Sequence, residues 1–559
     1  MKTLAPLVSA IFATGFADVG SIKELRTKLT ALGLFGMCLS IAPVRDKSFF
    51  RPDYISSSVR ALKVAVSGMF VLLVFAAPIA APAQAYKVVG NGVYSYSPLV
   101  QGFDGNLYGA AYGIQGTYGK AGSIFRMTNS GKITTIYTFC SQPSCTDGIR
   151  PGGLVVGTDG NIYGITFQGG ANTNANCNFD GTQLSCGTLF QITQTGKLTT
   201  LYSFCSVADC ADGSLPVGPL IQATDGNFYG MTSSGGNTQY CTINSNGCGT
   251  IFEITSAGKL TTLYAFCGSS GCLDGAYPYG NLTEGLDGNL YGTTASGGAG
   301  AWYFNCSGCG TIFKVTPQGV LTSLYNFCIS ESCTDGSTPE VGLVLAANGV
   351  FYGATTGGGA NNYGTIYSFT ASGGLTTLYS FCSQPNCTDG EGSGALIQAT
   401  DGNLYGYTPF GGTTDSGTLF KITTSGALTT IYQYPYCGVS CGPGAFPQDT
   451  LLQDTNGIIY GSADVGSTGN GVIYSWTAPQ LHRFVETLPS SGKVGAKVTI
   501  LGNKLTGATA VSFNGTEATF TVVSGNEITT AVPSGATSGK VKVTTPGGVI
   551  STYVEFRVP

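Results

Sequence analysis

Cysteine is the residue type whose spacing carries the most chemistry in this 559-residue sequence. The chain has 19 cysteines, of which Cys38 lies in an N-terminal segment that we expect to be removed. The others form short pairs, most of them separated by four residues, at equivalent places in repeated units. The remaining cysteines are even in number, belong to a protein that we expect to be exported, and recur at equivalent positions, which together predict disulfide bonds. The predicted disulfides are Cys140–Cys145, Cys177–Cys186, Cys205–Cys210, Cys241–Cys248, Cys267–Cys272, Cys306–Cys309, Cys328–Cys333, Cys382–Cys387 and Cys437–Cys441.

A zinc site is the alternative interpretation of the cysteines. Cys306 and Cys309 are separated by two residues, which is the spacing of half a zinc site. A closed site needs four ligands, and the only histidine, His482, lies far along the sequence. We therefore predict disulfides and expect neither a metal ion nor a cofactor.

Few side chains in the sequence have the chemistry of catalytic residues. His482 is the only imidazole and falls in a predicted linker, where a solvated histidine is expected. Its isolation excludes Ser-His-Asp, Cys-His and multi-histidine metal arrangements. Two carboxylates can still hydrolyse a glycoside, which leaves a carbohydrate-active hydrolase or lyase as an alternative function. We assign no catalytic residue from the sequence.

A set of carboxylates recurs after the cysteine pairs in the string C-x-D-G. Repeat equivalence places them on one face of the fold, where an acidic ring would attract cations or a basic partner. The other interpretation, which we favour, is that each Asp is a turn residue. The set comprises Asp147, Asp212, Asp274, Asp335 and Asp389.

Aromatic residues in the variable loops are the more plausible ligand contacts. These loops combine Asn, Thr, Gly and Tyr with local cysteine pairs. Flat rings there would offer platforms to a sugar or a peptide, although rings can also pack on their own loop. The predicted binding residues are Tyr240, Trp302, Tyr303, Phe304 and Tyr363.

Tandem repeats predict the elements that must position these residues. The string D-G-N-(L/I/F)-Y-G, or its N-G variant, starts at seven places that lie 53 to 66 residues apart. Two further strings, G-(T/S/V)-(I/L)-(F/Y) and (L/I)-T-(T/S)-(L/I)-Y, follow it. Each unit therefore contains four short strands with bulky apolar residues on both faces. Stacking seven such sheets radially buries both faces, so we predict an all-β fold with a seven-bladed β-propeller over residues 86–481. A linear β-solenoid is the alternative.

The third string occurs six times, one fewer than the first two. Residues 88–96 end in V-Y-S-Y, which is similar to the L-Y-S-F that ends other units. We predict that this N-terminal strand completes the last blade and closes the ring, which removes exposed sheet edges.

The N-terminal segment differs in composition from the repeats. Residues 59–85 combine a positive start, an apolar stretch and a small-x-small ending, which predicts a signal peptide cleaved after Ala85. An uncleaved membrane anchor is the alternative. Residues 1–58 are then a mis-annotated or disordered extension. The protein is expected to be secreted or at the cell surface, touching a membrane only through this segment.

The C-terminal residues 488–559, after a linker at 482–487, lack cysteine and contain alternating strands typical of a small sandwich. Their strings V-T-I-L-G-N-K-L-T-G, A-V-S-F-N-G and T-T-P-G-G resemble the IPT/TIG immunoglobulin-like family. The repeats resemble the GloVer tandem-repeat family through D-G-N-L-Y-G, G-T-(I/L)-F and L-T-T-L-Y-x-F-C. That resemblance implies an exported, propeller-like protein without an assigned activity.

The charge balance excludes one large class of partner. The chain has 25 Lys+Arg against 29 Asp+Glu, so it lacks the basic surface of a nucleic-acid-binding protein. We expect an exported, non-enzymatic, monomeric binding or surface-interaction protein that presents its variable loops to a polysaccharide or a surface protein. A structural component of the cell envelope is a further alternative.

Overall fold

The computed structural model describes residues 85–95, 97–112, 121–173, 177, 185–241, 246–300, 308–330, 332–436, 442–465 and 471–559. These residues form antiparallel β-sheets joined by turns and short 3-10 segments, as predicted. Two compact units are distinguished, residues 1–80 and 81–559, and all described residues belong to the second. No helix within the described ranges is long and apolar enough to cross a membrane.

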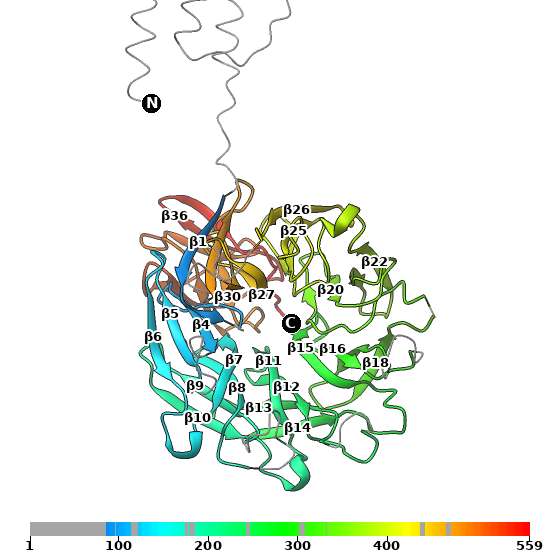
Figure 1. The fold of residues 1–559 in the computed structure, drawn as a ribbon. Helices are drawn as coiled ribbons and strands as arrows, with labels where there is room; N and C mark the ends of the chain where they lie inside the picture. The colour runs from blue at the N-terminus through cyan, green and yellow to red at the C-terminus, as the bar shows by residue number, and fades with distance from the viewer. Residues whose placement is uncertain are drawn as a thin grey trace, which may run out of the picture. The chain divides into compact units, whose positions relative to one another are not determined.

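Seven sheets of the described chain derive from the repeats, and we number them blade 1 to blade 7 in chain order (Figure 1). In blades 2 to 6 the four strands follow one another in sequence, each paired with the next. Blades 1 to 3 contain the strands β2 (Tyr94–Ser95), β3 (Val100–Gln101), β4 (Leu107–Tyr112), β5 (Ser123–Met127), β6 (Ile133–Thr138); β7 (Ile149–Val156), β8 (Ile162–Gln168), β9 (Thr188–Ile192), β10 (Leu198–Ser203); β11 (Ser214–Gln222), β12 (Phe228–Ser234), β13 (Thr250–Ile254) and β14 (Leu260–Ala265).

The other four blades repeat the pattern. Their strands are β15 (Ala276–Glu284), β16 (Leu290–Ser296), β17 (Thr311–Val315), β18 (Leu321–Asn326); β19 (Val344–Leu345), β20 (Phe351–Thr355), β21 (Thr365–Phe369), β22 (Leu375–Ser380); β23 (Ile397–Gln398), β24 (Leu404–Thr408), β25 (Thr418–Ile422), β26 (Leu428–Gln433); β27 (Ala445–Gln453), β28 (Ile459–Val465) and β29 (Val472–Thr477). Short 3-10 segments η3 (Pro143–Cys145), η5 (Ala208–Cys210) and η6 (Pro385–Cys387) lie between blades.

The D-G-N string forms the turn between the first two strands of a blade. In blade 1, Asp104 accepts hydrogen bonds from the Asn106 backbone at 3.1 Å and from the Tyr108 hydroxyl at 2.8 Å. Gly105 supplies the positive φ of 75° that the turn needs. The same contacts recur in the other D-G-N copies, so the string is primarily a structural signature.

The last blade is completed by the N-terminal strand β1 (Ala85–Asn91), which pairs antiparallel with β29. Tyr86 lies opposite Trp476 and stacks on Tyr432, with ring centroids 4.0 Å apart. The segment that pairs is therefore residues 85–91. The V-Y-S-Y string that suggested closure falls partly in β2, which pairs with β4 in blade 1. Joining the first and last repeats in one sheet is what makes the array a closed propeller.

Neighbouring blades are held together by clasps at the D-G-N ends. The side chain at the end of a first strand accepts a hydrogen bond from the backbone N–H just before the turn of the preceding blade. The clasped pairs are Thr158 with Gln222, Thr224 with Glu284, Ala347 with Gln398, Thr400 with Gln453 and Thr455 with Gln101. At the other two junctions both positions are apolar, Phe103 with Val156 and Leu286 with Leu345.

The C-terminal segment folds as two four-stranded sheets around a separate apolar core that includes Val498, Ile528 and Phe556. Its first strand begins at Glu486, inside the predicted linker. The strands are β30 (Glu486–Leu488), β31 (Lys497–Leu501), β32 (Ala510–Phe513), β33 (Thr516–Ala518), β34 (Phe520–Val522), β35 (Glu527–Ala531), β36 (Val541–Thr545) and β37 (Gly548–Ser551). This is the predicted immunoglobulin-like sandwich.

Candidate functional site

Two kinds of connection share one end of every blade. The loop between the second and third strands and the loop from the fourth strand to the next blade both lie opposite the D-G-N turns, because successive strands are antiparallel. We call this end the loop face. It contains the variable loops and the cysteine pairs, so it holds nearly all of the residues that the sequence singled out.

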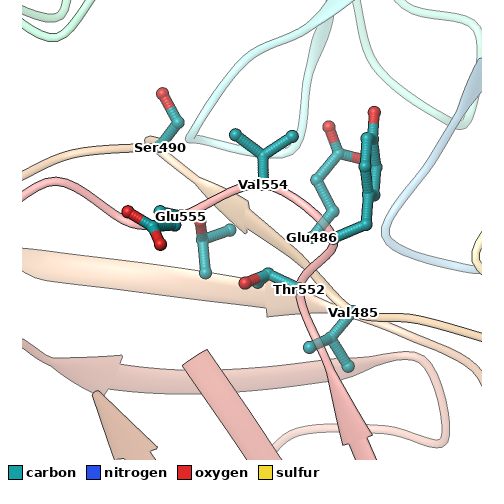
Figure 2. Close-up of a pocket in the computed structure, with 8 residues that line it drawn as sticks. Val485, Glu486, Ser490, Thr552, Val554 and Glu555 are labelled. Carbon is teal, nitrogen blue, oxygen red and sulfur yellow. The ribbon is translucent and has the colours of Figure 1, made fainter. Parts of the chain in front are cut away.

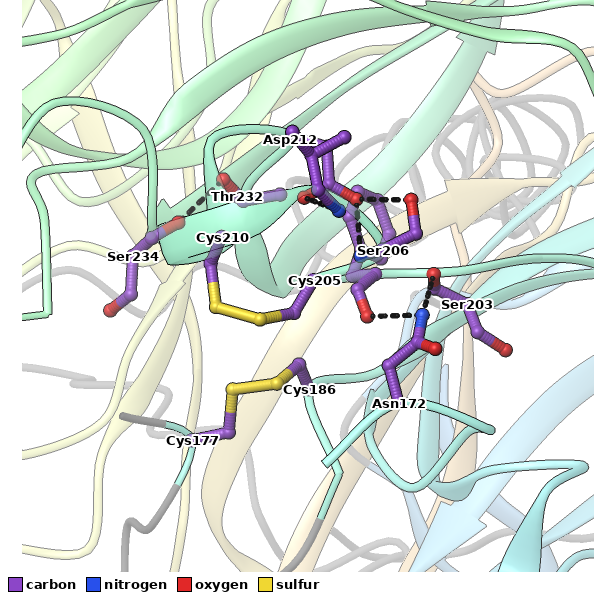
Figure 3. The surroundings of a disulfide bond; sticks show 12 residues. Asn172, Cys177, Cys186, Ser203, Cys205, Ser206, Cys210, Asp212, Thr232 and Ser234 are labelled. Carbon is purple, nitrogen blue, oxygen red and sulfur yellow. Dashed lines mark hydrogen bonds between the residues drawn. A yellow bond between two sulfur atoms is a disulfide. The ribbon is translucent and has the colours of Figure 1, made fainter. Parts of the chain in front are cut away.

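The recurring C-x-D-G carboxylates hold their own loops. Asp212 is 3% exposed and accepts hydrogen bonds from the Tyr202 hydroxyl at 2.8 Å and from the Ser206 backbone at 2.9 Å (Figure 3). Burial raises the pKa of Tyr202 to about 12. Asp147 and Asp389 are buried in the same way, with the equivalent tyrosine and serine partners.

The two remaining members of that set are less buried. Asp274 accepts from the Tyr264 hydroxyl and Asp335 from the Tyr325 hydroxyl, both at 2.9 Å. Every carboxylate of the set therefore has a local structural partner. Three of the five are also shielded from solvent, so these residues do not line up as an open acidic ring. Ligand binding by any of them stays a prediction.

The predicted aromatic platforms have different surroundings. Tyr363 is 41% exposed, and its backbone carbonyl accepts a hydrogen bond from Gly392 of the next blade at 2.9 Å. Tyr240 is half-buried against the core of blades 3 and 4. Trp302, Tyr303 and Phe304 lie outside the described residues. Of this set, Tyr363 is the one that the structure places as an accessible ring.

The disulfides form as predicted wherever the structure describes both cysteines. They are Cys140–Cys145, Cys177–Cys186, Cys205–Cys210, Cys241–Cys248, Cys267–Cys272, Cys328–Cys333 and Cys382–Cys387. Cys306, Cys437 and Cys441 lie outside the described residues.

Sequence reasoning missed a ring of strained residues where the first strands begin on the loop face. These residues have left-handed backbone conformations although they are not glycine, and each donates its N–H to a carbonyl of the preceding blade. Such conformations in bulky residues are uncommon and concentrate at functional sites. The signal in the sequence is a proline directly after each of them. They are Arg150, Leu215, Tyr277, Thr338 and Phe446, with φ of 59°, 55°, 54°, 57° and 53°.

The half-buried side chain of Phe446 lies beside an exposed aromatic ring. Phe410, from the variable loop of blade 6, is 52% exposed, and its ring centroid lies 6.0 Å from that of Phe446. The backbone N–H of Glu391 donates to the Phe410 carbonyl at 3.0 Å. Partial burial and the nearby Asp415 raise the pKa of the Glu391 carboxyl. Two rings and two carboxylates thus meet between blades 6 and 7.

A second aromatic and carboxylate pair lies two junctions away, between blades 4 and 5. Tyr279 in blade 4 is 45% exposed. Partial burial and the charge of Glu340 in blade 5 raise the pKa of Tyr279, and partial burial also raises the pKa of Glu340. We define the loop-face patch as two groups of residues on blades 4 to 7. The first is the pair Tyr279 and Glu340. The second comprises Tyr363, Glu391, Phe410, Asp415 and Phe446, which the contacts above link across blades 5 to 7.

The C-terminal sandwich has a pocket of its own, with a volume of about 140 Å³ (Figure 2). Glu486, Ser490, Thr552 and Glu555 are among the residues that line it. Pockets for small organic ligands usually measure about 300 Å³ or more, so this one is too small to be the main candidate.

Comparison with known proteins identifies two segments. Residues 179–392 match the Gloeobacter/Verrucomicrobia repeat, and residues 479–558 match the IPT/TIG domain, in agreement with the resemblances in the sequence. No curated protein matches the chain.

Two solved structures illustrate a distant similarity. A fungal alcohol oxidase of the AA5 family in complex with copper is 13% identical, covers 86% of this chain and 99% of its own, and gives a TM-score of 0.48. The PQQ-bound aldose sugar dehydrogenase of Streptomyces coelicolor is 12% identical, with coverage of 71% and 99% and a TM-score of 0.36. Likenesses this weak carry no argument about activity.

Proposed function

We propose that this repeat-built propeller, with its C-terminal IPT/TIG domain, is an exported, non-enzymatic binding protein whose loop-face patch holds a glycan. The carrying observation is the pair of exposed rings on successive blades, Tyr363 and Phe410, with the half-buried ring of Phe446 next to them and Glu391 and Asp415 beside them. Aromatic faces pack on the apolar faces of sugar rings, and carboxylates accept hydrogen bonds from sugar hydroxyls. Disulfides in successive blades support export.

A glycan array probed with the purified protein tests the proposal. We expect Phe410→Ala to weaken binding of the best glycan about tenfold, which corresponds to about 1.4 kcal/mol. The matched control is Val320→Ala, which removes a 62% exposed side chain at the opposite end of blade 4 and should leave the affinity unchanged. A protein ligand, or no ligand on glycan and peptide arrays, would overturn the glycan assignment. An empty array would favour a structural component of the envelope.

A carbohydrate-active hydrolase is the second candidate, and the raised pKa of Glu391 beside Asp415 is the observation that favours it. A raised pKa favours the protonated form of a carboxyl group, which can act as a general acid, and a neighbouring carboxylate can act as the base or nucleophile. Incubating the array-positive polysaccharide with the protein would reveal shortened chains. Turnover that Glu391→Gln abolishes would replace the binding proposal with this one.

A further inference from the structure

Two disulfides are packed against each other in blade 2. Cys177–Cys186 pins the variable loop, and Cys205–Cys210 pins the loop that leads to blade 3 (Figure 3). All four sulfur atoms lie within 4.8 Å of one another. Cys177, Cys186 and Cys210 are at most 1% exposed, whereas Cys205 is half-buried. Two cysteine pairs from separate loops of the chain therefore form one compact sulfur cluster.

The same arrangement recurs where a variable loop carries its own pair. In blade 3, the sulfurs of Cys248, Cys267 and Cys272 lie within 4.8 Å of one another, and Cys241 is bonded to Cys248. In blade 4 the cluster contains Cys309, Cys328 and Cys333. The pairs Cys140–Cys145 and Cys382–Cys387 follow blades whose variable loops have no cysteine, so they offer two sulfurs each.

We propose that the blade 2 quartet, when reduced, is a tetrahedral four-thiolate site for a thiophilic divalent cation, Zn²⁺. A dithiol reductant would be oxidised to its own disulfide while each protein disulfide takes up two electrons and two protons. Zn²⁺ then replaces the four thiol protons, which leave to solvent, and four sulfur–zinc bonds replace the two sulfur–sulfur bonds. The disulfide form and the zinc form are thus alternative cross-links of the same two loops.

The cluster is already compact enough for one ion. Zinc–sulfur bonds of about 2.3 Å place the sulfurs of a tetrahedral site about 3.8 Å apart, which lies within the 4.8 Å that bounds the blade 2 cluster. The two sulfurs of each disulfide must move apart to reach that spacing once their bond is reduced. Four cysteines are also the complete ligand set of a structural zinc site, so no histidine is required. The half-buried edge at Cys205 gives the ion a path and keeps part of the thiolate charge near water.

The test measures zinc bound to the full-length protein after reduction with a phosphine, which is oxidised to its oxide as each disulfide opens. We expect the reduced protein to retain at least one Zn²⁺ per chain after gel filtration, bound by the blade 2 quartet, and the oxidised protein to retain none. Loading with Co²⁺ instead should give the thiolate-to-cobalt absorption of a tetrahedral site.

Two double variants separate the quartet from non-specific thiol binding. Cys177→Ser with Cys186→Ser should lower the zinc content by one, whereas Cys140→Ser with Cys145→Ser, a pair that belongs to no larger ligand group among the described residues, should not change it. Equal losses in both variants, or no zinc in the reduced protein, would overturn the proposal. Circular dichroism tells whether the reduced chain is folded; a chain that unfolds on reduction and does not regain strand signal with Zn²⁺ also overturns it.

Discussion

A single buried carboxylate distinguishes the last D-G-N-type turn from the six others. Asp454 is 1% exposed, and its Oδ2 atom has no hydrogen-bond partner among the described residues. The equivalent positions in the other repeats are all glycine or alanine. Burial is the main cause that raises the pKa of Asp454 to about 7, with Glu486 adding to it.

Asp454 should make the stability of the protein depend on pH. An unfolded Asp has a pKa of about 3.9, so between about pH 4 and pH 7 the folded state holds a proton that the unfolded state has released. The contribution of Asp454 to the free energy of unfolding is therefore highest below about pH 4. It falls as the pH rises to about 7 and does not change further at higher pH. Thermal unfolding of the protein and of Asp454→Asn across this range checks the effect.

The variant supplies the control, because Asn cannot ionise. We expect the melting temperature of Asp454→Asn relative to the original protein to rise from pH 5 to pH 8. A constant difference across that range would show that Asp454 is not protonated in the folded state.

At the scale of elements, the closing strand β1 depends on Tyr86. Its ring stacks on Tyr432, lies 5.1 Å from the ring of Tyr474, and its hydroxyl donates to the carbonyl of Pro443. Without β1, strand β29 would become an exposed sheet edge. Ring closure therefore rests on the pairing of β1 with β29 together with the packing of the Tyr86 ring.

Two substitutions separate the packing of Tyr86 from its hydrogen bond. Tyr86→Ala should lower the free energy of unfolding by about 3 kcal/mol, as for a large aromatic residue removed from a core. Tyr86→Phe should cost only about 1 kcal/mol, because it keeps the stacked ring. Chemical denaturation measures both values, and equal losses would contradict this division.

The clasps between blades offer a second element-scale prediction. Gln101 is 7% exposed and makes two hydrogen bonds to Thr455, at 2.9 and 3.2 Å. Gln101→Leu should lower the free energy of unfolding by about 1–3 kcal/mol, since a buried N–H loses its acceptor. Gln222→Leu removes an equivalent clasp that is exposed to water, so its loss should be smaller. Denaturant titrations of both variants test the ranking.

The sequence could predict the local frame but not the contacts between distant parts. Turn glycines, alternating strands and cysteine spacing are encoded within one repeat, so the blades and the disulfides follow from the repeat. The sandwich follows in the same local way from the alternating strands of residues 488–559. The Gln101–Thr455 clasp joins residues 354 positions apart, and Glu391 beside Asp415 depends on how two connections meet. For that reason the variable loops pointed to Tyr363, whereas Phe410, Phe446 and the carboxylates of the patch emerged only in three dimensions.

At the scale of the whole molecule, the disulfides tie together loops that have little apolar core of their own. Each short bridge stabilises the fold by restricting the unfolded chain, by about 2 kcal/mol in the chain-entropy account. Thiol counting on the unfolded, unreduced protein should find no free thiol beyond Cys38, if that residue is retained. Several free thiols per chain would contradict the predicted pairing of Cys306 with Cys309 and of Cys437 with Cys441.

The unequal clasps also bear on which blades can pair during folding. Five junctions carry a polar acceptor at the end of the first strand and two carry an apolar residue there, and the two kinds alternate irregularly around the ring. A blade that skipped its neighbour would place Gln222 against Phe103 and leave its amide facing an apolar ring. Near-identical repeats in one chain are prone to such mispairing. The unequal clasps give the correct neighbour an advantage that the repeated strings alone could not provide.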